Sequence, residues 1–263
     1  MSNIARAFTA ADGSRKKAFI PFLTCGDPSL EVTEEAVLAM VGAGADLVEL
    51  GVPFSDPTAE GVTIQNANIR ALAGGVTTDD CFELVGRLRA KTDVPLAFMT
   101  YANVVYSYGI ARFAGRAEQV GLDGVILPDV PFEEKAEFAG SLAARGVDLV
   151  SLIAPTSHER VRAIAREARG FVYCVSSLGV TGVRAQITTD VGAMVDLVRQ
   201  ETDVPVAVGF GIATPEQAAR MAGLSDGAIV GSAIVRLFEE HGARAIPHVE
   251  EYVRRMAAAA HDA

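Results

Sequence analysis

Residues 48–61, VELGVPFSDPTAEG, carry the side chains best suited to acid–base chemistry. Glu49 lies inside the apolar, β-branched run 46–52, which is typical of a buried strand. Burying a carboxylate costs on the order of several kcal/mol unless it is paired or has a chemical role. The loop that follows contains proline and glycine and adds two acids, Asp56 and Glu60. A buried acid at the end of a strand, followed by an acidic loop, is typical of catalysis in a barrel enzyme.

The two candidate acids differ in how strongly the sequence supports them. Strand alternation puts Leu47, Glu49 and Gly51 on one face, and if that face points inward, Glu49 lies near the mouth of a barrel. A structural acid would need a basic core partner, yet none of the other predicted strands contains Lys or Arg. A functional role for Glu49 is therefore favoured. Glu60 gives a weaker signal, because an acid in a surface loop is usually solvated, and Asp27 equally fits a helix cap or a turn.

Three glycine-rich stretches in the last third of the chain indicate a phosphate site. They are residues 178–182, 209–212 and 231–234, each at or just beyond the end of a predicted strand. The loops after strands seven and eight of a barrel commonly bind phosphate through backbone N–H groups. Glycine allows close approach of the backbone, and Ser232 adds a hydroxyl donor. Each stretch alone fits a tight turn equally well, but the three together favour phosphate.

Short apolar runs that alternate with helical patterns predict the fold. The predicted strands are residues 18–24, 47–52, 96–101, 124–128, 149–154, 171–176, 206–210 and 228–231. Continuously apolar strands of this kind are typical of parallel strands covered by helices. Eight units in about 250 residues predict an α/β (β/α)8 TIM barrel. We expect a single domain over residues 1–263, because no linker or composition shift divides the chain.

The alternative fold is a doubly wound open sheet, which normally shows a GxGxxG turn after its first strand. Residues 24–28 read TCGDP instead, so the barrel is favoured. We also expect an extra N-terminal helix over residues 3–11 and a closing helix over residues 245–260.

Composition excludes several classes of protein. The net charge of −10 and the pI near 4.9 argue against nucleic-acid binding and against docking on anionic membranes. No apolar run is long enough to span a bilayer, and the N-terminus lacks a signal-peptide core. The three cysteines, Cys25, Cys81 and Cys174, are far apart and lack metal-ligand spacing. They therefore predict reduced thiols in a cytoplasmic protein without a metal site.

These motifs closely resemble the tryptophan synthase α-subunit family over nearly the whole chain. The strand signature of the family stands here as ELGVPFSDP at residues 49–57. Further matching segments are residues 21–28, 64–68, 101–103, 128–131, 179–182, 209–212 and 231–235. The resemblance implies a barrel that cleaves indole-3-glycerol phosphate to indole and glyceraldehyde 3-phosphate by a retro-aldol step, with no cofactor in this subunit.

The family resemblance also implies roles for individual residues. Glu49 matches the carboxyl group that protonates indole C3 and helps to deprotonate the glycerol hydroxyl, and a buried, apolar environment that raises its pKa suits this role. Thr181 matches a loop position that closes over substrate and contacts the second acid. The remaining matches are Phe22, Met99 and Tyr173 for the indole pocket, and Gly182, Gly211, Gly231 and Ser232 for phosphate.

The chain departs from the family at the second acid. The family most often has Asp in PLADGP, whereas residues 57–62 read PTAEGV. Glu60 keeps the charge but adds one methylene, about 1.5 Å of reach. Because positioning errors near 1 Å can cost on the order of 10²-fold in rate, either the loop has adapted around Glu60 or the enzyme is slower alone, and we favour adaptation. The accompanying changes at Thr58 and Val62 favour this hypothesis.

The resemblance further implies a partner, a β subunit that uses pyridoxal phosphate (PLP) in an α2β2 assembly. Positions that match the family's contact surface are Asp56, Pro57, Asn103 and Pro131. Two other functions stay open at this point. One is a free-standing lyase that releases indole, and the other is a barrel that binds a sugar phosphate or serves mainly as an activator of its partner.

Overall fold

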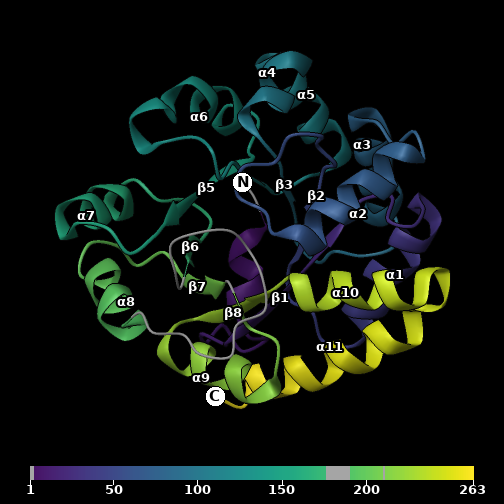
Figure 1. Ribbon diagram of the computed structural model, residues 1–263. Helices are drawn as coiled ribbons and strands as arrows, with labels where there is room; N and C mark the ends of the chain where they lie inside the picture. The colour runs from purple at the N-terminus through teal and green to yellow at the C-terminus, as the bar shows by residue number, and fades with distance from the viewer. Residues whose placement is uncertain (1–2, 176–189, 210) are drawn as a thin grey trace.

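The centre of the computed structural model is a closed barrel of parallel strands that pair in chain order (Figure 1). The structure describes residues 3–175, 190–209 and 211–263. The strands are β1 Ala18–Thr24, β2 Val48–Gly51, β3 Leu96–Met99, β4 Gly124–Ile126, β5 Asp148–Ile153, β6 Val172–Val175, β7 Val206–Gly209 and β8 Gly227–Val230. The predicted (β/α)8 fold class is therefore confirmed.

Helices surround the barrel on its outside, as Figure 1 shows. They are α1 Leu30–Gly42, α2 Val62–Ala73, α3 Thr78–Arg89, α4 Ala102–Tyr108, α5 Ile110–Val120, α6 Ala136–Ala143, α7 His158–Arg166, α8 Val191–Arg199, α9 Pro215–Leu224, α10 Ser232–His241 and α11 Ile246–His261. Short 3-10 helices occur at Ile4–Phe8, Phe132–Glu134 and Gly242–Arg244. Local sequence explains where several helices begin: Thr77 and Thr214 each form a capping box with the residue three positions on. None of these described helices has the length and apolar character of a membrane span.

The ends of the elements differ from the sequence-based boundaries. The strand expected over residues 96–101 ends at Met99, because Tyr101 already serves as the N-cap of α4. The last residues of the strands expected over 171–176 and 206–210 lie outside the described residues. The helix expected over residues 3–11 is only the short 3-10 helix Ile4–Phe8. Its buried side chains, Ile4, Ala7 and Phe8, pack into the barrel interior.

Two apolar cores confirm the strand alternation. Leu47, Ala97 and Ile126 belong to the cluster inside the barrel. Val48 and Leu50 belong to the cluster between strands and helices. Successive residues of β2 therefore face opposite sides, and Glu49, which is fully buried, faces the interior with Leu47.

Candidate active site

Glu49 is a buried acid without a partner. It stands in register with Phe22 on β1 and Ala97 on β3. Its exposed fraction is 0%, and neither carboxyl oxygen has a hydrogen-bond partner among the described residues. Burial therefore raises the pKa of Glu49 well above its usual value of 4.5. A carboxyl group of this kind retains its proton at a pH where a surface glutamate has lost it, so Glu49 can act as a general acid.

Aromatic and apolar side chains surround Glu49. Burial and the charge of Glu49 both raise the pKa of Tyr173 on β6, so the two groups lie close enough to interact. Phe22 packs beside Met99, Ile64 and Ala67. The structure thus brings Phe22, Met99 and Tyr173, the three residues expected to hold an indole ring, to the same end of the barrel.

Two glycines make room for these rings. A Cβ atom on Gly51 would lie 2.7 Å from Cζ of Phe22, and one on Gly209 would lie 2.5 Å from the Tyr173 hydroxyl oxygen. Both distances are too short for a carbon atom, so each ring lies against a bare backbone. The two glycines therefore have a packing role in the pocket.

Glu60 is not the solvated loop acid that the residue pattern alone indicated; that expectation is wrong. Its exposed fraction is only 8%, and its Oε2 accepts a hydrogen bond of 2.6 Å from Nδ2 of Asn68. Desolvation raises the pKa of Glu60 to about 7, although the hydrogen bonds with Asn68 and Tyr101 lower it. Glu60 therefore exchanges its proton close to neutral pH.

Three residues that sequence reasoning did not assign hold the loop of Glu60. The Tyr101 hydroxyl accepts a hydrogen bond of 3.2 Å from the backbone N–H of Ala59. The Gln65 amide donates to the backbone carbonyl of Glu60 at 2.7 Å. Asn68 was detectable in principle, because it is a polar residue on the face of α2 that also carries Ile64, Ala67 and Ala71.

Asp27 does not cap a helix, but it takes part in the turn after β1, where its backbone N–H donates to the carbonyl of Thr24 at 3.4 Å. Ser29 caps α1 instead. The carboxylate of Asp27 is buried and forms two bonds of 2.7 Å with Arg70, one to Nε and one to an Nη atom. This ion pair ties the loop after β1 to α2, the helix that carries the partners of Glu60.

The candidate phosphate residues follow β7 and β8. Gly231 is the N-cap of α10, and Ser232 is its first residue. Gly211 has a φ of 81°, a left-handed conformation that favours glycine. The first N–H groups of a helix lack partners within the helix and attract anions. Gly182, the remaining residue expected at the phosphate, lies outside the described residues, as does Thr181, which is expected to contact the second acid.

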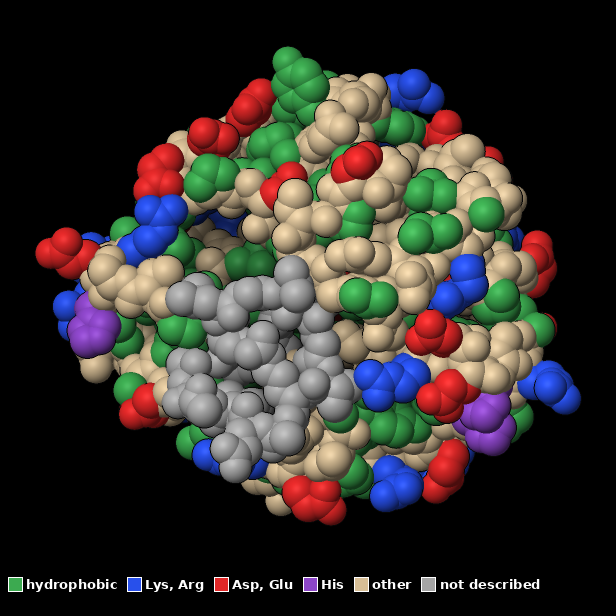
Figure 2. Space-filling model, in the orientation of Figure 1, with side chains coloured by type: hydrophobic (Ala, Val, Ile, Leu, Met, Phe, Trp, Pro, Cys, Tyr) green, Lys and Arg blue, Asp and Glu red, His purple; other side chains and the backbone are tan. Residues whose placement is uncertain are grey.

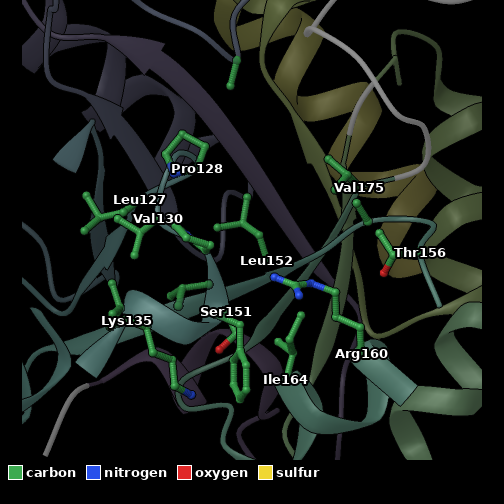
Figure 3. Close-up of a pocket in the computed structure, with 16 residues that line it drawn as sticks. Leu127, Pro128, Val130, Lys135, Ser151, Leu152, Thr156, Arg160, Ile164 and Val175 are labelled. Atoms are coloured by element: carbon green, nitrogen blue, oxygen red, sulfur yellow. The ribbon is translucent and has the colours of Figure 1, made fainter. Parts of the chain in front are cut away.

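A cavity of about 300 Å³ is lined by residues of β5 and of the loops after β2 and β4. Ala59, next to Glu60, forms part of its wall, together with Pro128, Leu152 and Val175. Figure 3 shows Lys135 and Arg160 farther along it. These two cations are already paired, with Glu167 and Glu133. Glu49 does not line this cavity. Glu60 does not line it either, so the cavity adjoins the loop of Glu60 without including either candidate acid.

The candidate partner residues are accessible at the same end of the barrel. Asp56, Asn103 and Pro131 are exposed, and Pro57 is half-buried. The loop after β4 is joined to the start of α4, because Asp129 accepts hydrogen bonds of 3.0 and 3.2 Å from the backbone N–H of Ala102. The described residues contain no group of three or more His, Cys, Asp or Glu that could hold a metal ion.

Comparisons with known proteins agree over nearly the full chain. A family model described as tryptophan synthase alpha chain matches residues 8–261. The alpha chain of Lactiplantibacillus plantarum is 50% identical over 241 residues, which is 91% of each chain. That of Geobacter sulfurreducens is 48% identical over 240 residues, again 91% of each.

Solved structures show the same likeness. A chain of Mycobacterium tuberculosis tryptophan synthase has a TM-score of 0.90 at 33% identity, covering 99% of this chain and 98% of that one. A chain of the tryptophan synthase α2β2 complex from Pyrococcus furiosus has a TM-score of 0.85 at 33% identity, covering 92% and 99%.

Proposed function

The chain belongs to the tryptophan synthase alpha chain family, and we propose that it cleaves indole-3-glycerol phosphate with Glu49 and Glu60 as its two acids. The products are indole and glyceraldehyde 3-phosphate. The observation that carries this proposal is Glu49, a fully buried carboxyl group without a partner among the described residues. Such a group is costly for the fold and is suited to proton transfer.

Glu49 gives one proton to the substrate and takes one proton back, so the reaction is balanced in protons. Protonated Glu49 donates its proton to C3 of the indole ring, which places positive charge on the ring nitrogen. The bond between C3 and the glycerol chain then breaks, and its electron pair returns to the ring. The hydroxyl on the departing carbon becomes the aldehyde and returns its proton to Glu49. The group is thereby ready for another cycle.

Glu60 stabilises the charge that develops on the ring. Its carboxylate faces the N–H group of the indole and attracts it as the ring becomes positive. A pKa of about 7 means that a large part of Glu60 is ionised at neutral pH. Phe22, Met99 and Tyr173 hold the ring by apolar contact. Glu49 keeps its proton whereas Glu60 loses it, because the environments of the two acids differ.

The phosphate of the substrate binds at the loops after β6, β7 and β8. Gly211, Gly231 and Ser232 supply backbone N–H groups and one hydroxyl, and the N-terminus of α10 favours the negative charge. The family resemblance assigns Gly182 to the phosphate and Thr181 to Glu60, and both residues lie outside the described part of the chain. A Cβ on Gly231 would lie 3.3 Å from Cδ1 of Phe22, so the phosphate end adjoins the indole end.

A β subunit takes up the indole. Asp56, Pro57, Asn103 and Pro131 form the contact, and the exposed ring of Tyr106 adds apolar area beside them. Proton transfer of the kind described needs no cofactor in this chain, and PLP belongs to the partner. On the face seen in Figure 2, the described acidic and basic side chains are intermixed, without a continuous basic patch for nucleic acid. The three buried free cysteines support a cytoplasmic location.

The test is release of indole from indole-3-glycerol phosphate by the purified chain, alone and with a β subunit. We expect activity in both cases, and more with the partner. Glu49→Gln should abolish turnover, because an amide cannot donate and retrieve the proton. If the chain is active but a β subunit neither binds it nor raises its activity, the chain is a free-standing lyase. A lack of indole release in both preparations would indicate a barrel that only binds or activates.

A further inference from the structure

The structure shows what takes up the extra length of Glu60. Its Oε2 accepts a hydrogen bond of 2.6 Å from Nδ2 of Asn68, which lies eight positions on in the buried face of α2. Both side chains are largely shielded from water, with exposed fractions of 8% for Glu60 and 3% for Asn68. A hydrogen bond in such a place is strong and does not exchange freely with solvent.

We propose that Asn68 is a positioning residue that holds the carboxylate of Glu60 where the lyase reaction needs it, an assignment that rests on the function proposed above. The glutamate side chain is longer than the aspartate that is most common in the family. Without an anchor, its additional torsion angle would allow several positions of the carboxylate. Asn68 selects one of them.

Helix α2 is a firm support for this contact. On one side, Arg70 is held by two bonds of 2.7 Å to the buried Asp27. On another, Ile64 and Ala67 pack against Phe22, the residue in register with Glu49. A displacement of α2 would therefore disturb both the ion pair and the apolar pocket.

The same helix holds the main chain of Glu60. The Gln65 side chain donates to the backbone carbonyl of Glu60 at 2.7 Å, while Asn68 donates to its carboxylate. Two adjacent turns of α2 therefore hold both the backbone and the carboxylate of Glu60. The position of the charge is thereby set by regular structure rather than by the loop itself.

No charged partner in the described part of the chain sets the pKa of Glu60, so the hydrogen bond from Asn68 has a large effect on it. Tyr101, the N-cap of α4, hydrogen bonds with Glu60, and burial together with the charge of Glu60 raises the pKa of this phenol, so it stays a proton donor. The charge of Asp129, in the loop after β4, also raises the pKa of Tyr101. The more distant charges on this side are the Arg70–Asp27 pair and Glu239 of α10. None of the ion pairs among the described residues includes Glu60, so neutral donors alone oppose its desolvation.

The experiment compares Asn68→Leu with Asn66→Leu. Leucine has a similar size to asparagine but no donor. Asn66 is the matched control, because it lies on the same helix and its side chain donates a hydrogen bond of 3.5 Å to Glu239 rather than to Glu60. We measure kcat and KM for indole release from pH 5.5 to 9, and urea unfolding of each variant. Asn68→Ser, which is smaller and too short to reach Glu60, serves if the leucine variant fails to fold.

For Asn68→Leu we expect kcat to fall on the order of 10-fold or more. The acidic limb of the kcat profile should move above pH 7, because the hydrogen bond that lowers the pKa of Glu60 is lost. KM should change little, since the phosphate residues lie on other elements. Asn66→Leu should retain the wild-type kcat and pH profile.

Combining Asn68→Leu with Glu60→Asp tests the match in length. An aspartate is too short to reach Asn68, so the second substitution should cost little once the first is present. Additive losses, or a folded Asn68 variant with the wild-type kcat and profile, would overturn the assignment while the lyase function stands. A wild-type chain without lyase activity would overturn the proposed function and this assignment with it.

Discussion

Replacing Glu49 by Gln should make the stability of this protein depend on pH in a different way. Below about pH 4.5, the usual pKa of a glutamate, the wild-type group carries its proton in both the folded and the unfolded chain. Above that pH the unfolded chain releases the proton, whereas the buried carboxyl of the folded chain keeps it. The wild type therefore loses stability relative to Glu49→Gln as the pH rises.

The magnitude follows from proton linkage. Each pH unit between the unfolded and the folded pKa costs about 1.4 kcal/mol of unfolding free energy. From pH 5 to pH 7 the stability difference should therefore change by up to about 2.7 kcal/mol in favour of the variant. Any fixed cost of burying the glutamine amide shifts all points equally and leaves the slope unchanged.

The assay is urea unfolding of both proteins at half-unit steps from pH 4 to pH 8. Glu34→Gln is a control of opposite sign, because hydrogen bonds with Lys91 and Arg87 lower the pKa of Glu34. Wild-type Glu34 should therefore stabilise the fold more at neutral pH than at pH 4. A stability difference between wild type and Glu49→Gln that is flat, or that shrinks as the pH rises, would show that Glu49 is ionised in the folded chain and would refute the reasoning.

Two further predictions concern activity. Because the pKa of Glu60 is about 7, wild-type kcat should rise with pH through this value, and Glu60→Gln should lose that limb; full activity in the Gln variant would exclude Glu60 as the second acid. In Gly51→Ala, a Cβ 2.7 Å from Phe22 Cζ should cost roughly 1–3 kcal/mol of stability and raise KM. Urea unfolding and steady-state indole release check this, with Gly115→Ala as a control where the added Cβ meets open space.

The fold was predictable because its signals are local. Apolar runs separated by helical patterns identified every strand of the barrel, and alternation along β2 placed Glu49 inside it. Strand ends were less accurate, since the residues that leave the sheet are still apolar or aromatic. Tyr101 is an example: its composition fits a strand, but its backbone caps α4.

The setting of Glu60 was not predictable, because no local pattern encodes it. A polar residue between proline and glycine looks solvated in sequence. Its burial arises from Asn68 on the following helix and from Tyr101 at the start of α4. The same holds for Asp27, whose partner Arg70 lies on a different element.

Periodicity and residue type alone established the barrel, the acid on β2 and the glycine-rich turns, because each depends on neighbours within a few positions. The tertiary structure decided the protonation of the two acids. Burial raises the pKa of Glu49, and no described residue bonds to its carboxyl oxygens to offset this, so Glu49 keeps its proton. Glu60 titrates near neutrality because desolvation by the packed elements opposes hydrogen bonds from two of them. Ionisation depends on solvent exclusion and on distances across the fold, which only the packed chain defines.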